Sequence, residues 1–191
     1  MFDTYTAGFS INVAPVGLPF FDDFAYDGVR PNPALWQDDD VLINRNFAQD
    51  PPSIGVATFD GVDVTGQPYE GGNGGQRTVV RDYLTSSPVN LRDSTGTTLT
   101  FYLQPRGFGN RPETQDSFLV EFLDVAGTWN TVYKKEGVFD TWPNNEPLPF
   151  EPVLLAIPDE YLYNGFQFRF ASKSSEQGAV DMWHLDYVKL S

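Results

Sequence analysis

Short alternating runs of apolar and polar residues recur along this chain. Residues 99–103 and 118–123 place apolar side chains at every second position, and residues 129–133 follow the latter run after a glycine turn. A period of two is typical of a strand with one buried face, so the second and third runs predict a hairpin. Residues 166–170 put three phenylalanines on one face, and residues 183–190 form the last predicted strand.

Helical periodicity is nearly absent. The sequence predicts one helical turn, at residues 158–162, because its fifteen prolines would interrupt longer helices. Strands that return every ~10–15 residues between Gly, Pro, Asn and Asp clusters predict an all-β fold, an antiparallel two-sheet β-sandwich. At a length of 191 residues we expect a single domain over residues 18–191, with residues 1–17 as an extension or an edge strand.

The chain is strongly acidic, with a formal net charge of -14. Nine aspartates lie between Asp22 and Asp63, and Arg30 and Arg45 are the only basic residues in that stretch. Nucleic acid and anionic membrane surfaces are bound by clusters of Lys and Arg, so the composition argues against both partners. A cation, a neutral sugar or a basic protein suits this charge.

Three features that the sequence lacks restrict the possible functions and locations further. The chain has no cysteine, which excludes disulfides and thiolate metal sites. No apolar run approaches the ~18 residues that span a bilayer, so we expect no membrane insertion. No basic residue precedes Arg30, so we expect no secretory signal peptide within the sequence as given.

Several segments carry a family resemblance. The first is Phe21-Asp22-Asp23-Phe24, the second is residues 116–122 followed by Gly127-Thr128-Trp129, and the third is residues 166–170 followed by residues 181–188. In this order and spacing they resemble the opening strand, the central hairpin and the closing strands of MAM-like and related concanavalin A-like (LamG-type) jelly-roll domains. The resemblance implies a jelly-roll sandwich.

The family resemblance also implies a cellular location. Such domains occur in large secreted or surface proteins of gliding Gram-negative bacteria, which often use the type IX route, so the resemblance implies an extracellular or cell-surface location. One position departs from the pattern, because Tyr187 stands where the family often has a second aspartate.

The dense aspartates predict a structural calcium site. Calcium takes six to eight oxygen ligands from carboxylates, carbonyls and water. The first and last strands of a jelly roll commonly lie side by side, and related domains often hold calcium there, so the resemblance implies ligands among Asp22, Asp23, Asp181 and Asp186. The alternative is that these acids are solvated residues at strand ends and turns.

Other acidic segments are weaker candidates for a cation. The loop at residues 60–66 has the Asp and Gly content of a cation loop, but its spacing departs from the EF-hand pattern and turn chemistry explains it equally well. The triplet at residues 38–40 is explained by an exposed edge. Glu113 and Asp116 flank a predicted strand and could meet a cation, although ordinary loop acids also look like this.

The sequence argues against an enzyme. His184 is the only histidine, and strand alternation places it on the face of Asp186 and opposite Trp183, Leu185 and Tyr187. We therefore expect a surface or edge histidine rather than a general base. A glycoside hydrolase or lyase needs only two carboxylates, but the Glu-x-Asp-x-x-Glu motif of hydrolases with this fold is absent.

Sugar binding is supported by aromatic residues in irregular segments. A flat aromatic ring can cover the apolar face of a sugar while amides and guanidinium groups bind its hydroxyls. Trp142 beside Asn144 is the leading candidate, and Phe108 flanked by Arg106 and Arg111 is the second. Weaker candidates are Tyr69, Tyr83 and Tyr163. We expect the other three tryptophans, Trp36, Trp129 and Trp183, to lie in the core.

Taken together, these features predict a non-catalytic, calcium-stabilised recognition or adhesion module that binds glycan or a protein partner. Two alternatives stay open. One is a structural or assembly subunit, such as a spacer or a component of secretion or gliding machinery, that binds no sugar. The other is a glycoside hydrolase or lyase.

Overall fold

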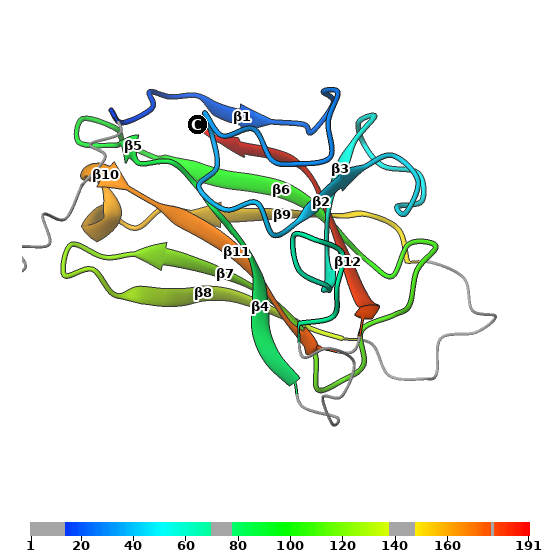
Figure 1. The fold of residues 1–191 in the computed structure, drawn as a ribbon. Helices are drawn as coiled ribbons and strands as arrows, with labels where there is room; N and C mark the ends of the chain where they lie inside the picture. Colours follow the sequence, from blue (N-terminus) through cyan, green and yellow to red (C-terminus); the bar gives the residue numbers. More distant parts are fainter. Residues whose placement is uncertain (1–13, 70–77, 138–147, 177) are drawn as a thin grey trace, which may run out of the picture.

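A computed structural model of the chain describes residues 14–69, 78–137, 148–176 and 178–191. The fold is an antiparallel β-sandwich of two main sheets, as predicted (Figure 1). The six-stranded sheet contains β1 (Phe20–Asp22), β2 (Leu42–Asn44), β3 (Val56–Gly61), β6 (Thr98–Pro105), β9 (Glu151–Ala156) and β12 (Gly178–Leu190). The four-stranded sheet contains β4 (Thr78–Thr85), β7 (Ser117–Leu123), β8 (Trp129–Glu136) and β11 (Phe168–Ser175).

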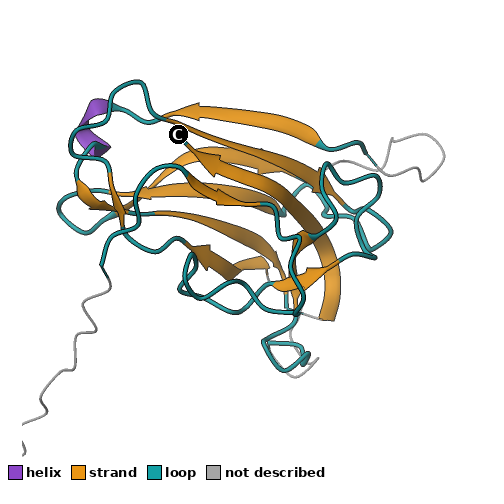
Figure 2. Ribbon diagram, turned by 90° about the horizontal axis from the view of Figure 1, so that it is seen from above, coloured by secondary structure: helices purple, strands orange, loops and turns teal. Residues whose placement is uncertain are grey.

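Smaller elements close one end of the sandwich. Strands β5 (Val89–Asn90) and β10 (Asn164–Phe166) form a two-stranded sheet, and the predicted helical turn is the 3-10 helix η2 (Asp159–Tyr161). This helix lies at the edge of the sandwich, apart from both main sheets (Figure 2). The predicted hairpin is β7–β8, whereas the run of three phenylalanines is divided between β10 and β11 at Gln167.

The first and last strands lie side by side. Phe20 of β1 pairs with Leu190 of β12, and Asp22 pairs with Val188. Before β1, Val16 forms a bridge to Val89, so the end of the predicted extension contacts β5. The first and last strands are thus neighbours in the six-stranded sheet (Figure 1).

Aromatic rings fill the space between the two sheets. The ring of Trp36 lies 5.1 Å from that of Phe20, 5.9 Å from Phe168 and 6.2 Å from Phe170, and all four residues are buried. The contacts with Phe20 and Phe168 are edge-to-face, and such contacts add to the free energy gained from burying aromatic area. The core therefore forms where the inward positions of β1 and β11 meet Trp36.

The prediction that three tryptophans are buried is correct for two of them. Trp36 and Trp183 are buried, but Trp129 is only half-buried on the outer face of the four-stranded sheet. Trp129 pairs with Leu123 at the end of β7. Because Phe118 and Phe122 of β7 point inward, Leu123 and its cross-strand partner point outward.

Candidate functional site

A β-bulge in β12 turns Tyr187 onto the outer face of the six-stranded sheet. The pairing of β12 with β6 shifts register between Asp186 and Lys189, and Tyr187 has φ +53°. Alternation predicts Tyr187 on the inner face with Trp183, and that prediction is wrong: the residue is 42% exposed. A bulge inserts an extra residue and re-aims the side chain, and a positive φ is a strained choice for a tyrosine.

The bulge completes a row of exposed aromatic rings. The ring of Tyr187 lies 5.0 Å from that of Phe21 on β1 and 6.2 Å from that of Tyr102 on β6, both in edge-to-face geometry. Phe21 is 39% exposed. We call Phe21, Tyr187 and Tyr102 the aromatic row. Packing in the core does not account for it, because its rings lie outside the sandwich.

One end of the aromatic row opens into a groove of about 370 Å³. Its walls come from the loop after β2, from β6 and from the segment that leads into β9. The lining residues within the described part of the chain are Gln49, Asp50, Pro52, Tyr102, Gln104, Leu148, Pro149 and Phe150. A mainly apolar concavity of this size with a few polar groups is typical of a site for a small ligand.

Gln104 ties the walls of the groove together. Its amide nitrogen donates to the carbonyl oxygens of Gln49 (2.9 Å) and Leu148 (2.8 Å), and its Oε1 accepts the Gln49 N–H at 2.9 Å. The side-chain Oε1 of Gln49 is buried and accepts no hydrogen bond within the described part of the chain. The hydrogen bonds of Gln104 therefore fix the loop after β2 against the segment that leads into β9.

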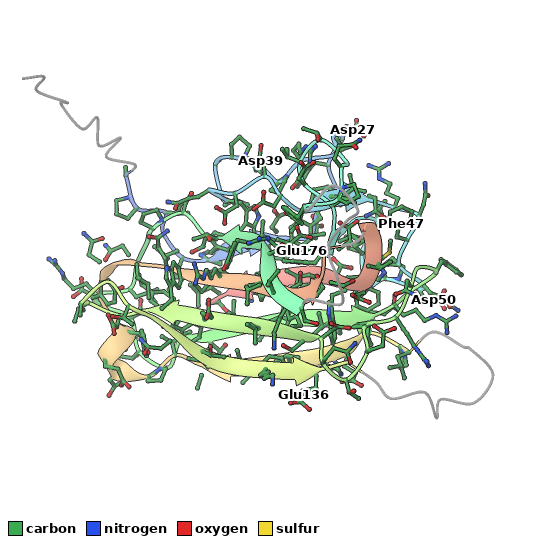
Figure 3. All side chains as sticks on the ribbon, turned by 60° about the horizontal axis from the view of Figure 1, so that its bottom comes forward. Asp27, Asp39, Phe47, Asp50, Glu136 and Glu176 are labelled. Atoms are coloured by element: carbon green, nitrogen blue, oxygen red, sulfur yellow. The ribbon has the colours of Figure 1, made fainter. Side chains whose placement is uncertain are left out.

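Asp50 places a carboxylate at the mouth of the groove. The residue is exposed and has φ +49°, which few residues other than glycine adopt. Figure 3 shows Asp50 and Phe47 on the same side of the molecule, well away from Glu136. The groove therefore combines aromatic walls with one exposed acceptor group, the Asp50 carboxylate.

His184 is fully buried, so the prediction of a surface or edge histidine is wrong. Alternation does place it on the outer face, but residues around Phe47 and Arg106 cover that face. Nε2 lies 3.0 Å from the Arg106 carbonyl and Nδ1 lies 2.9 Å from Thr58 Oγ1. Since a carbonyl only accepts, Nε2 carries the proton and Nδ1 accepts from the Thr58 hydroxyl. Burial lowers the His184 pKa to about 4.

The predicted calcium ligands near the chain ends occupy different surroundings. Asp22 is buried and accepts hydrogen bonds from Trp36 Nε1 (2.7 Å) and the Phe24 N–H (2.8 Å). Burial raises its pKa, and these two bonds oppose the rise. The carboxylate of Asp22 is thus hydrogen-bonded within the core, where it orients Trp36.

Asp23 and Asp186 come together around Ser53. The Ser53 N–H donates to Asp186 Oδ2 at 2.7 Å, and the Ser53 hydroxyl lies 2.8 Å from Asp186 Oδ1 and 2.6 Å from the Asp23 carbonyl oxygen. Burial raises the pKa of Asp186. Asp181 lies five residues earlier on β12, or about 16 Å at ~3.3 Å per residue, so it does not join this group.

Asp181 instead joins Glu113 and Asp116, which the sequence marked only as weak candidates. One carboxylate oxygen from each of the three residues lies within 4.8 Å of the other two. Glu113 and Asp181 border a cavity of about 380 Å³, also lined by Asn110 and Ser175, which we call the acidic pocket, and the buried Asp116 lies next to them. Sequence spacing gives no sign of this group, because β12 and the loop before β7 are far apart along the chain.

Burial and mutual repulsion act on the acidic pocket. Asp116 is almost completely buried, and burial followed by the negative charge of Asp181 raises its pKa to about 7. Burial also raises the pKa of Asp181, although hydrogen bonds from Ser175 oppose this. Without a bound cation, the negative charge on one of these carboxyls disfavours ionisation of the others.

The other predicted cation loop is organised as a turn. Asp63 Oδ1 accepts the N–H groups of Thr65 and Gln67, and Asp60 Oδ1 accepts the N–H of Val62. These are the local side-chain bonds that aspartate commonly makes in turns. Turn chemistry therefore accounts for this segment.

Three predicted sugar-binding residues, Phe108, Arg106 and Arg111, are not among the described residues that line the groove. Phe108 is 68% exposed, and its N–H donates to the Phe47 carbonyl at 2.7 Å. Arg106 and Arg111 belong to the same loop, and the Arg106 N–H donates to the Met182 carbonyl. Two further predicted residues, Trp142 and Asn144, fall outside the described residues.

A second aromatic cluster lies on the outer face of the four-stranded sheet. The Arg169 guanidinium carbon is 4.6 Å from the Tyr83 ring centre and 4.3 Å from that of Trp129. Arg169 Nε also donates to Glu121 Oε2 at 2.6 Å. This cluster offers an alternative aromatic surface, although its rings already pack against the guanidinium.

The sequence prediction missed Tyr102 and Tyr187 as site residues. Tyr102 could have been found, because it alternates with inward-facing Phe101 and Leu103 and must therefore face outward. Tyr187 could not have been found in this way, because its position depends on the bulge.

Comparisons with known proteins support the fold. No family model and no curated protein matches the chain. The K1 cleaved adhesin domain of Lys-gingipain from Porphyromonas gingivalis W83 is 15% identical, with a TM-score of 0.58 over 92% of this chain and 98% of that domain. The K2 domain of Lys-gingipain is 14% identical, with a TM-score of 0.54 over 91% and 98%.

A carbohydrate-binding module has the same architecture. The C-terminal family 22 module of Clostridium thermocellum Xyn10B is 11% identical, with a TM-score of 0.51 over 90% of this chain and 92% of that module. At these identities the likeness shows the fold alone, a β-sandwich shared with adhesin and carbohydrate-binding domains. None of the helices in the described residues has the length and hydrophobicity to cross a membrane.

Proposed function

We propose that this chain is a non-catalytic recognition module that binds glycan through the groove and the aromatic row. The observation that carries the proposal is the strained bulge at Tyr187, which sets an exposed ring between Phe21 and Tyr102. Strained backbone persists where the surrounding structure maintains it, and it is frequent at functional sites. Exposed aromatic rings on a rigid sheet are suited to the apolar faces of sugars.

The charge and chemistry of the groove favour a neutral glycan. The exposed Asp50 carboxylate accepts hydrogen bonds, which sugar hydroxyls donate. The net charge of -14 disfavours an acidic polysaccharide. Only one carboxylate, Asp50, is among the described residues that line the groove, whereas glycoside hydrolysis requires two, which supports a binding role.

The structural neighbours support the same class of function. They include adhesin domains and a carbohydrate-binding module, and the MAM-like resemblance of the sequence agrees with a recognition domain. We infer an extracellular or cell-surface location on the same grounds. An assembly subunit without sugar binding is the alternative.

We expect Tyr102→Ala to weaken binding of a soluble neutral polysaccharide by tenfold or more, because Tyr102 belongs to both the groove and the aromatic row. Central aromatic residues typically contribute about 2 kcal/mol or more to a binding interface. The measurement is calorimetric titration with xylan, mannan and β-glucan, after screening on a glycan array. Val125→Ala, which removes a 77% exposed side chain in the β7–β8 turn, is the matched control.

Three further outcomes would contradict parts of this proposal. If Trp129→Ala abolishes binding and Tyr102→Ala does not, the glycan binds the four-stranded sheet around Arg169 instead. If the protein binds none of the glycans on the array, this result would count against glycan binding and favour an assembly role. Release of reducing ends from any of these polysaccharides would contradict the non-catalytic assignment.

A further inference from the structure

We propose that Glu113, Asp116 and Asp181 hold a single calcium ion in the acidic pocket, which fastens the loop before β7 to the start of β12. This is a different place from the chain ends, where the sequence predicts calcium. The proposal is independent of glycan binding, because none of the three residues lines the groove.

The first support is the geometry of the oxygen atoms. A carboxylate oxygen from each of the three residues lies within 4.8 Å of the other two, which allows all three to contact one ion between them. Calcium–oxygen distances of about 2.3–2.6 Å fit this spacing. The chemistry is that of a hard cation, because every side chain in the group offers oxygen.

The second support is an unsatisfied buried atom. Asp116 is 1% exposed, and its Oδ2 accepts the Glu113 N–H at 2.7 Å. Its Oδ1 is buried and has no hydrogen-bond donor within the described residues. A buried carboxylate oxygen without a donor is costly, and a bound cation would satisfy it.

The third support is that the described pocket lining contains no positive side chain. Its lining consists of Thr78, Asn110, Glu113, Gln115, Ser175, Val180 and Asp181. Three carboxyls in close contact repel one another unless they bind protons or a cation. The cavity of about 380 Å³ beside them has room for water molecules, which would complete the six to eight ligands of calcium.

Hydrogen bonds hold the Asp181 and Asp116 carboxylates in place. Ser175 donates through its N–H (2.9 Å) and its hydroxyl (2.7 Å) to Asp181 Oδ2, and the Asp181 N–H donates to Asn110 Oδ1 at 3.1 Å. A Cβ on Gly137 would lie 1.9 Å from the Glu113 carbonyl oxygen, so this glycine permits the close approach of the loop to the end of β8. Two of the three carboxylates are therefore positioned by the protein itself.

The chain-end aspartates lack these features. Both oxygens of Asp22 accept hydrogen bonds from Phe24 and Trp36, and both oxygens of Asp186 lie within 2.8 Å of donors on Ser53. Neither residue has an unsatisfied buried oxygen among the described atoms. The observations therefore favour the acidic pocket over the chain ends.

The test is calorimetric titration of exhaustively chelated protein with CaCl₂, with MgCl₂ as a second titrant. We expect one calcium per chain, weaker binding of magnesium, and a rise in melting temperature of about 5–10 °C at saturating calcium. Glu113→Gln should weaken calcium binding at least tenfold. Glu113 is exposed, so this variant should keep its fold.

Asp116→Asn should reduce calcium binding further. Asp39→Asn, at an exposed aspartate in the loop before β2, is the matched control that should leave calcium binding unchanged. Asp186→Asn tests the chain ends. The proposal is overturned if chelated protein binds no calcium and holds no metal by elemental analysis. It is also overturned if Glu113→Gln and Asp116→Asn bind normally while Asp186→Asn does not.

Discussion

Alanine in place of Asp22 is expected to lower the free energy of unfolding by about 2–4 kcal/mol, equally in calcium and in chelator. The Asp22 carboxylate accepts the Trp36 indole N–H and the Phe24 N–H, and both donors would be left without a partner in the interior. Each buried donor without a partner costs about 1–3 kcal/mol. The loss of the Asp22 charge, which burial disfavours, offsets part of this. Chemical denaturation with and without chelator measures the change.

Asp22→Asn is the matched control, because it removes the charge and keeps one oxygen acceptor. We expect it to lose less stability than Asp22→Ala in both buffers. A loss that appears only when calcium is present would instead make Asp22 a metal ligand, and would revive a calcium site at the chain ends.

Acidification from pH 6.5 to pH 4 is expected to remove up to about 3 kcal/mol of stability through His184 alone. Burial lowers the folded-state pKa of His184 to about 4, below its ordinary value of 6.5. Between these values the unfolded chain binds a proton that the folded chain does not, so the stability present above pH 6.5 is lost as the pH falls. A shift of about 2.5 pKa units corresponds to the stated energy.

The measurement is denaturant unfolding at pH 7 and pH 4.5, for the natural chain and for His184→Gln. Glutamine lacks the titration and can still reach Thr58 and Arg106. The comparison between the two chains is essential, because a buried acid acts in the opposite direction: burial raises the pKa of Asp60 to about 6, which favours the folded state as the pH falls. Equal pH dependence in both chains would show that His184 does not titrate as its burial requires.

The proposed glycan site and the proposed calcium site both lie where β12 has irregular backbone geometry. In each, a loop lies against β12 where this strand departs from regular geometry, at Tyr187 beside the groove and at Asp181 in the acidic pocket. Both residues have φ +53°. Irregular positions in an otherwise regular strand aim side chains that alternation alone would direct elsewhere. The long last strand thus connects the proposed glycan surface with the proposed cation site.

The fold followed from the order of the residues alone. The period of two in residues 118–123 and 129–133 specifies the β7–β8 hairpin, because a slip of one residue would expose Phe118 and Phe122 to water. The same periodicity, with the turn residues between runs, was sufficient to predict an antiparallel sandwich.

The site depended on the tertiary structure. Alternation assigns His184 to the outer face but cannot show that a loop covers this face, and it directs Tyr187 inward because it contains no bulge. The meeting of Glu113 and Asp116 with Asp181 is equally invisible in the sequence. The sequence by itself determined which residues can share a strand face, since that depends on neighbours along the chain. Only the tertiary structure decided which faces are covered and which distant carboxylates meet, because both depend on how loops pack across strands.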